Sequence, residues 1–259
     1  MGAPTPIALI AFDMYGTLAR NDSSAWEGTV HAVAREQELS VPGKALWAEW
    51  SAREVSFRKT RTNMADPGAS PPFRTYWEAW RDTFVDSFAA LGITGDAGAA
   101  ATRCVDALGE REPFPDAAPT LEALDGHHAL AVLSNADDRY LEATIRHNGW
   151  RFGTVVSSES ARAYKPDPRI FATFCSRAGV APEQVLYVGD SPYDDVHGAK
   201  LAGMQTVLVL RDQRTPGRTP PPETTELLPA DHEIDSLAQL VPLVLEAVQV
   251  GAARRPTEK

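Results

Sequence analysis

Cysteine is scarce in this chain, which has two in 259 residues, Cys104 and Cys175. Two cysteines make no disulfide framework, and so few are typical of a reducing compartment, so we expect a cytoplasmic protein. The chain also has no apolar run near the roughly 20 residues that a membrane span needs. Its first six residues lack the basic region of a secretory signal. We therefore expect neither a secreted protein nor a membrane protein.

Positive charge is in short supply, because 25 Lys and Arg residues stand against 35 Asp and Glu residues, for a net charge of −10. This acidic balance argues against binding to nucleic acid or to an anionic membrane surface. At 259 residues the chain is long enough to bury a large core. We expect a small-molecule substrate as its partner, and either a monomer or a homodimer.

Helical periodicity follows the first short apolar run and lasts almost a hundred residues. It predicts four helices, at 24–38, from near Pro42 to Phe57, at 73–91 and at 96–109, which are enough for a small bundle. Aromatic residues recur at spacings of three or four along the third helix: Phe73, Trp77, Trp80, Phe84 and Phe88. We interpret this stripe as the core of the bundle, and the alternative is a surface that contacts substrate.

Strand and helix patterns alternate from Pro113 onward. Alternating βα units predict the α/β class, with a doubly wound, parallel-sheet, Rossmann-like core and an inserted α-helical cap domain. The predicted strands after the cap are 129–134, 155–156, 185–189, 206–210 and 232–234. The predicted domains are a catalytic core of residues 1–18 and 113–250, a helical cap of residues 19–112 and a flexible tail of residues 251–259.

Two further segments carry local predictions. Asp137 precedes a helical pattern and is expected to cap that helix. Residues 213–226, rich in Pro and Thr, are expected to form a surface loop.

An aspartate, Asp13, ends the first apolar strand, and Gly16 and Thr17 follow it in a tight turn. Open α/β sheets place their chemistry at the carboxyl ends of strands. Gly16 allows the chain to turn, and the Thr17 hydroxyl can hydrogen-bond back across that turn. Asp190 follows the 185–189 strand in the same way, so we expect the two carboxylates to meet in one crevice.

A hydroxyl and a lysine are expected in the same crevice. Ser134 ends the 129–134 strand, and Lys165 is fixed in a loop before Pro166. Facing carboxylates such as Asp13 and Asp190 are destabilised unless a cation lies between them. Mg²⁺ suits such hard oxygen ligands. The pattern therefore predicts a Mg²⁺ site.

The order Asp-x-x-x-Thr, Ser-Asn, Lys-Pro-Asp and Gly-Asp-Ser-x-x-x-Asp resembles the haloacid dehalogenase superfamily of aspartate-nucleophile hydrolases, in the subfamily with a helical cap. The resemblance implies that Asp13 is the nucleophile. It also implies metal ligation by Asp13, the backbone carbonyl of Tyr15 and Asp190, with Asp195 acting through water. Asp194 is interpreted as a helix cap or a solvent-facing acid.

The resemblance also assigns the groups that surround the nucleophile. Ser134 and the backbone N–H of Asn135 would bind a transferring oxygen, and Thr17 belongs to the catalytic turn. Lys165 would supply positive charge there, with its amine positioned by Asp195. We therefore expect a Mg²⁺-dependent phosphatase that acts on a small phosphorylated metabolite through an aspartyl-phosphate intermediate.

Tyr15 departs from the phosphatase pattern, which has a second aspartate at this position as general acid and base. The Asp-x-Tyr-Gly-Thr form resembles the L-2-haloacid dehalogenase branch, in which a halide leaves without a proton, so a dehalogenase is the alternative. That branch is metal-free, has serine where this chain has Asp190, and carries a halide-binding arginine that aligns with Ala48 here. Arg53 or Arg58 could replace it. A further alternative is a non-catalytic protein that binds phosphorylated metabolites.

Substrate specificity is expected to lie in the cap. Arg58, Lys59, Arg61 and Asn63 form the polar cluster there that best suits a substrate. We predict substrate binding by Arg58 and Arg61, and the alternative is a solvated basic loop.

Overall fold

A computed structural model describes residues 6–211, 219, 221–222 and 225–245. The predicted tail at 251–259 lies outside the described residues, as does much of the predicted loop at 213–226.

Six parallel strands form one sheet in the order β3-β2-β1-β4-β5-β6, which confirms the predicted α/β, Rossmann-like fold. The strands are β1 (Leu9–Phe12), β2 (Ala129–Ser134), β3 (Thr154–Ser157), β4 (Val185–Gly189), β5 (Gln205–Val209) and β6 (His232–Ile234). The strand order reverses beside β1, where open sheets form a crevice at their carboxyl ends. Phe12 is in register with Val132 on one side and with Val188 on the other, so the residues that follow these strands meet at one edge.

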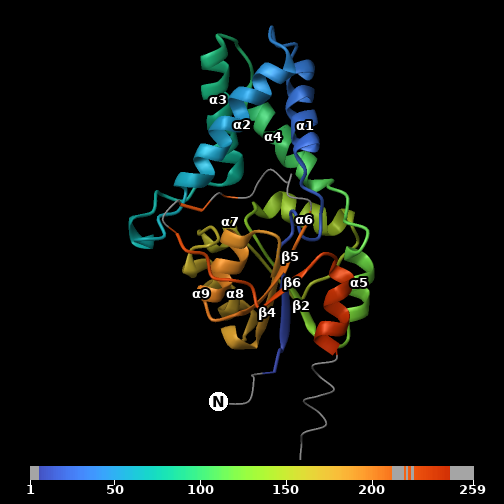
Figure 1. Ribbon diagram of the computed structural model, residues 1–259. Coiled ribbons are helices and arrows are strands. Elements are labelled where there is room, and N and C mark those ends of the chain that lie inside the picture. Colours follow the sequence, from blue (N-terminus) through green and yellow to red (C-terminus); the bar gives the residue numbers. More distant parts are fainter. Residues whose placement is uncertain (1–5, 212–218, 220, 223–224, 246–259) are drawn as a thin grey trace, which may run out of the picture.

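Helices cover both faces of the sheet (Figure 1). They are α5 (Ala117–Leu124), α6 (Asp138–His147), α7 (Ser158–Ala161), α8 (Pro168–Ala178), η3, a π-helical turn (Pro192–His197), and α9 (Gly198–Leu201). Strand β1 is buried on both faces, as its apolar run predicts. Ile10 and Phe12 belong to the larger hydrophobic core with α5 and α6, and Leu9 and Ala11 belong to the second core with α8 and α9.

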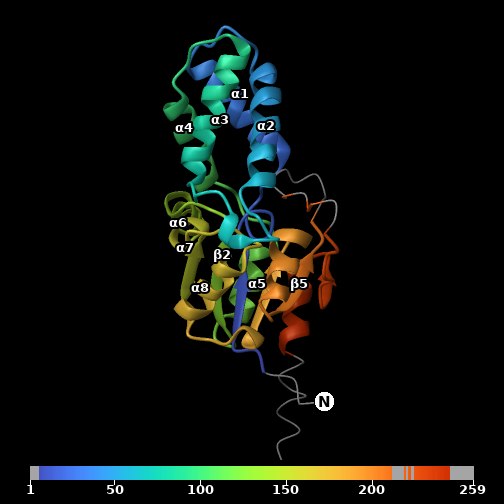
Figure 2. The ribbon, with the colours of Figure 1, turned by 90° about the vertical axis from the view of Figure 1, so that its left-hand side faces the viewer.

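Four long helices stand beyond the carboxyl edge of the sheet (Figures 1 and 2). They are α1 (Ser23–Glu36), α2 (Gly43–Thr60), α3 (Tyr76–Leu91) and α4 (Ala97–Gly109), close to the four predicted helices. Trp80, Phe84 and Phe88 of the α3 stripe are buried, so they do form part of the bundle core. The assignment of residues 19–112 to a separate cap domain stays a prediction.

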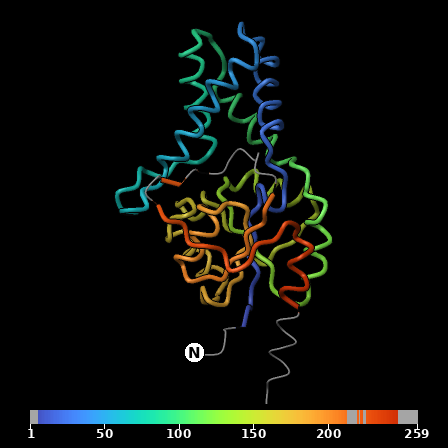
Figure 3. The backbone as a smooth tube through the Cα atoms, in the orientation of Figure 1, coloured from blue at the N-terminus to red at the C-terminus, as the bar shows by residue number. Residues whose placement is uncertain are grey.

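The two chain segments that join the bundle to the sheet run side by side (Figure 3). The backbone N–H of Arg20 donates to Glu112 at 2.9 Å, and that of Phe114 donates to Leu18 at 2.9 Å. An isolated β-bridge pairs Ala19 with Pro113 of the second segment. The bundle is therefore tied to the sheet at one narrow connection.

Asp137 forms a second tie between bundle and sheet. Its side chain makes no cap bond to α6, so the prediction that it caps this helix is wrong. Instead its carboxylate accepts the backbone N–H groups of Tyr76 at 2.7 Å and Trp77 at 2.8 Å, at the start of α3. Free N–H groups at a helix start attract a carboxylate from any part of the chain. Burial raises the pKa of Asp137 to about 6.

Across the residues that the structure describes, we find no helix that combines the length and the apolar character of a membrane span.

Valine-to-alanine changes should separate the buried sheet from the exposed helix surface. Val188 is fully buried in β4, and Val85 is half exposed on α3. We expect Val188→Ala to lower the free energy of unfolding by about 2–3 kcal/mol, because two methyl groups leave a gap that the core cannot close. Val85→Ala should change it by less than about 0.5 kcal/mol. Urea denaturation of both variants would measure this, and equal losses would contradict the described packing.

Candidate active site

A cavity lies between the carboxyl edge of the sheet and the helical bundle. Its volume, together with the space at its open mouth, is about 560 Å³. Its sheet side is lined by Asp13, Tyr15, Ser134, Asn135, Lys165, Asp190, Ser191, Asp194 and Asp195. Its remaining lining is Asn21, Trp26, Arg58, Arg61, Tyr76, Trp80, Leu108 and Tyr140. All of the predicted site residues except Thr17 are among these lining residues.

Asp13 lies at the floor of the cavity, directly after β1. One carboxylate oxygen, Oδ1, accepts hydrogen bonds from Lys165 Nζ at 2.7 Å and from Ser134 Oγ at 3.1 Å. Burial raises the pKa of Asp13 more than the neighbouring ammonium lowers it, to about 6. The carboxylate is therefore ionised at neutral pH, yet it is more basic than an ordinary aspartate.

Lys165 is fully buried, and its ammonium group, which has three N–H donors, lies within hydrogen-bond distance of four acceptors. Besides Asp13, Nζ donates to Asp195 Oδ1 at 2.6 Å, to Tyr187 Oη at 2.8 Å and to the Leu133 carbonyl at 3.2 Å. Burial alone would lower the pKa of Lys165, but the two carboxylates raise it well above its usual value. The ammonium therefore stays charged, and Asp195 is in place to position it.

The Asn135 side chain holds the loop that carries Lys165. Its Oδ1 accepts the Lys165 backbone N–H at 2.7 Å, and its Nδ2 donates to the Lys165 carbonyl at 3.1 Å. This reciprocal pair joins the end of β2 to the lysine loop across 30 residues of sequence. The Asn135 side chain thus orients Lys165. The sequence predicts a role only for the backbone N–H of Asn135.

Three acids meet at the cavity floor. Asp13, Asp190 and Asp195 each bring one carboxylate oxygen within 4.8 Å of the others. Asp190 also packs against Gly16, where a Cβ atom would lie 2.7 Å from both carboxylate oxygens and the backbone φ is +103°. Only glycine fits that turn. The positive charge between Asp13 and Asp195 comes from the ammonium of Lys165.

Tyr15 and Thr17 turn away from the reacting end of the cavity. The Tyr15 hydroxyl lies 2.7 Å from Thr144 Oγ1 and donates to the Tyr140 carbonyl at 3.2 Å. Burial raises the pKa of Tyr15 far above its usual value, so its hydroxyl is a poor proton donor. Thr17 is fully buried, and its hydroxyl has no partner among the described residues, so the predicted bond across the turn is wrong.

Two arginines at the end of α2 face the cavity from the bundle. Arg58 and Arg61 are both buried, not solvated in a loop. Arg58 Nε donates to Glu54. Arg61 donates to the Tyr76 hydroxyl through Nη1 and to Asp194 Oδ2 at 3.2 Å through Nη2. The structure therefore brings both predicted substrate-binding arginines to the site, while their role stays a prediction.

Asp194 is neither a helix cap nor a solvent-facing acid, so that prediction is wrong. It is 6% exposed, and its Oδ2 accepts from Thr219 Oγ1 at 2.7 Å as well as from Arg61. The Arg61–Asp194 pair joins the bundle to the turn after β4 over 133 residues of sequence. No local sequence pattern predicts such a long-range contact.

A buried, ion-paired aspartate at the strand-order reversal, beneath a helical bundle, is the arrangement of a capped α/β hydrolase. A family model described as haloacid dehalogenase-like hydrolase matches residues 7–203. The chain belongs to this family of hydrolases, as its motifs predict.

Two haloacid dehalogenases are among the relatives that align along almost the whole chain. (S)-2-haloacid dehalogenase 4A of Burkholderia cepacia is 29% identical over 93% of this chain and 96% of the relative. (S)-2-haloacid dehalogenase 1 of Pseudomonas sp. strain CBS-3 is 27% identical over 94% and 99%. The structure of the L-2-haloacid dehalogenase of Xanthobacter autotrophicus with covalently bound chloropropionic acid matches with a TM-score of 0.70, at 25% identity over 92% and 98%.

These relatives overturn the main functional prediction. The expectation of a Mg²⁺-dependent phosphatase is wrong, because the chain aligns along nearly its full length with dehalogenases, the branch that the resemblance describes as metal-free. The Mg²⁺ ion was predicted because facing carboxylates repel each other. The charge of Lys165 already reduces that repulsion.

Removing the buried ammonium should make stability depend more strongly on pH. In Lys165→Met the carboxyls of Asp13 and Asp195 lose their cation, so the pKa of Asp13 rises further above its ordinary 3.8. A carboxyl with a raised pKa in the folded state binds its proton more tightly there, so the folded state loses stability as pH rises through that window. We expect the melting temperature to fall further below wild type at pH 8 than at pH 5.

The matched control is Lys200→Met, which removes a partly exposed ion pair with Asp231. It should lower the melting temperature little at either pH. An equal loss at both pH values in Lys165→Met would contradict the charge coupling at the cavity floor.

Proposed function

We propose that this protein is a 2-haloacid dehalogenase, which hydrolyses a 2-haloalkanoate to a 2-hydroxyalkanoate and halide. The observation that carries the proposal is the ionised carboxylate of Asp13 at the cavity floor, held by Lys165 and Ser134 and facing the arginines of the bundle. Two relatives named (S)-2-haloacid dehalogenase support the same assignment. We propose the (S)-enantiomer as substrate.

The first step is a displacement at carbon. Lys165 and Ser134 both bind Oδ1 of Asp13, so Oδ2 is the oxygen left to attack. It forms a bond to C2 of the substrate while the carbon–halogen bond breaks and the halide leaves with the electron pair. The product of this step is an ester between Asp13 and the substrate. A halide leaves without a proton, so this reaction needs no general acid at Tyr15, whose hydroxyl is hydrogen-bonded to the protein.

The halide departs toward the bundle, because in-line attack from the floor sends the leaving group to the opposite side. Arg58 and Arg61 are the cations on that side. Both terminal nitrogens of Arg61 are occupied by protein partners, whereas Arg58 uses Nε for Glu54 and has no described partner at its terminal nitrogens. Arg58 is therefore the better halide donor, and it replaces the arginine that Ala48 does not provide.

The second step hydrolyses the ester. Water attacks the carboxyl carbon of Asp13, and the negative charge that develops on Oδ1 is stabilised by the hydrogen bonds from Lys165 and Ser134. The carboxylates of Asp190 and Asp195 lie within reach to take the water proton. The bond from Oδ2 to the carboxyl carbon breaks, and that oxygen takes up the proton and leaves as the hydroxyl of the 2-hydroxy acid. Asp13 regains a carboxylate whose second oxygen comes from water, and the other water proton is released to solvent.

Halide release is the direct test. We expect the protein to release chloride from (S)-2-chloropropionate at the same rate with and without EDTA, because the ammonium of Lys165 supplies the positive charge at the floor. Ion chromatography measures the halide, and Asp13→Asn, which removes the nucleophile at nearly constant volume, should lose at least about 1,000-fold in kcat. Phosphate release from an aryl phosphate that returns with Mg²⁺ after EDTA, without halide release, would contradict the proposal.

The pH dependence of kcat/KM should follow the ionisation of Asp13. Asp13 has a pKa of about 6 and attacks only when ionised, so kcat/KM should fall about tenfold per pH unit below pH 6. Asp137 also has a pKa of about 6, so Asp137→Asn is the control and should keep the same break. A profile that is flat from pH 7 to pH 5 would contradict an ionised Asp13 as the attacking group.

A further inference from the structure

Asn21 is a polar residue in the aromatic part of the cavity. It lies between β1 and α1, is 8% exposed and lines the cavity. Its Oδ1 accepts a hydrogen bond from Trp26 Nε1 at 2.7 Å. An indole nitrogen only donates, so this bond fixes which end of the amide faces Trp26. The amide NH₂ therefore points away from Trp26, and it has no partner among the described residues.

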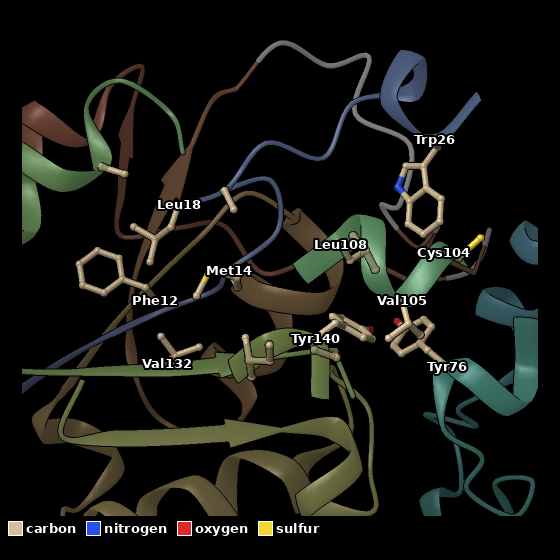
Figure 4. Close-up of a cluster of buried hydrophobic side chains, with 14 of the residues drawn as sticks. Phe12, Met14, Leu18, Trp26, Tyr76, Cys104, Val105, Leu108, Val132 and Tyr140 are labelled. Atoms are coloured by element: carbon tan, nitrogen blue, oxygen red, sulfur yellow. The ribbon is translucent and has the colours of Figure 1, made fainter. Parts of the chain in front are cut away.

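A row of three aromatic rings separates Asn21 from Arg61 along the bundle side of the cavity. The centroids of Trp26 and Trp80 lie 5.3 Å apart, those of Trp80 and Tyr76 lie 5.2 Å apart, and the Arg61 guanidinium lies 5.7 Å from the Tyr76 centroid. Figure 4 shows Trp26 and Tyr76 with the neighbouring side chains of the core. The wall is thus cationic at one end, apolar along its middle and neutral but hydrogen-bonding at the other end.

We infer that Asn21 is a specificity-determining residue, and that the preferred substrates are 2-haloacids whose C2 substituent combines an apolar stem with a neutral hydrogen-bond acceptor. This inference rests on the proposed dehalogenase function. The halide lies at the arginine end, the stem lies along the rings, and the acceptor receives an N–H of the Asn21 amide. A bound substrate displaces water from this donor, so a substrate that supplies an acceptor is favoured over one that leaves the N–H unpaired.

The acceptor is neutral because, among the described residues, the cations that line the cavity are Lys165 and the two arginines at the other end of the ring row. Arg111 lies 5.5 Å from the centroid of the Trp26 ring, and it is not among the lining residues. A second carboxylate on the substrate would have only the Asn21 amide as its partner, and this one contact would not offset the free energy of the carboxylate's lost hydration. An ether oxygen, which accepts and does not donate, is the simplest probe of this end.

The experiment compares two acids of equal length, 2-bromo-4-methoxybutanoate and 2-bromohexanoate, which differ by one oxygen in place of a methylene. We expect the wild-type kcat/KM for bromide release to be about tenfold higher for the ether, the size of one neutral hydrogen bond that the alkyl chain leaves unmade. Asn21→Asp keeps the acceptor for Trp26 and removes the donor, so the ratio should fall to one or below. Asn21→Leu, of similar volume, should also bring it to about one.

Gln239→Glu is the matched control, because Gln239 is exposed on the surface after β6 and its Oε1 accepts two backbone N–H groups that a glutamate would also bind. It should keep the wild-type ratio. A ratio near one in wild type, or a ratio unchanged in both Asn21 variants, would overturn the inference, as would a preference for 2-bromoglutarate over the ether. Bromide release from 2-bromopropionate is measured in parallel, and its absence would contradict the proposed function itself.

Discussion

The buried ammonium of Lys165 is the group on which the site depends. It lies 2.7 Å from Asp13 and 2.6 Å from Asp195, and all three side chains are withdrawn from water. Burying one such charge alone would cost several kcal/mol, and the arrangement is tolerable only because each charge has partners. The lysine also receives support from Tyr187, the Leu133 carbonyl and the loop contacts of Asn135. Three strands, β1, β2 and β4, are thus tied to one positive charge.

The topology of the sheet explains how distant segments reach that charge. Strand β1 lies between β2 and β4, so the residues after these strands share one edge although more than 100 residues separate β1 from either. The bundle is placed above this edge by the paired connecting segments, by Asp137 at the start of α3 and by the Arg61–Asp194 ion pair. Cavity shape therefore depends on contacts between bundle and sheet as much as on the floor.

Much of this could be predicted from sequence, because strand ends and helical periodicity are local. The four motifs indicated the family, and the aromatic stripe indicated a packed bundle. What failed were contacts between distant residues: the Asp137 side chain binds N–H groups of α3 instead of its own helix, and Asp194 pairs with Arg61. The functional error had the same origin. The sequence places Lys165 near the nucleophile but does not show that its ammonium lies between the carboxylates of Asp13 and Asp195, so the prediction supplied a metal as the cation.

The charges around the cavity also determine how an anion can bind. Among the described residues, four carboxylates line it, those of Asp13, Asp190, Asp194 and Asp195, against three cations, Arg58, Arg61 and Lys165. Net charge therefore does not attract a 2-haloacid, and the protein as a whole is acidic. Binding must come from directed donors at short range, which act where bulk charge does not. On the proposed function, the donors that select the anion are a few N–H groups of the cavity lining, such as those of Arg58 and Asn21.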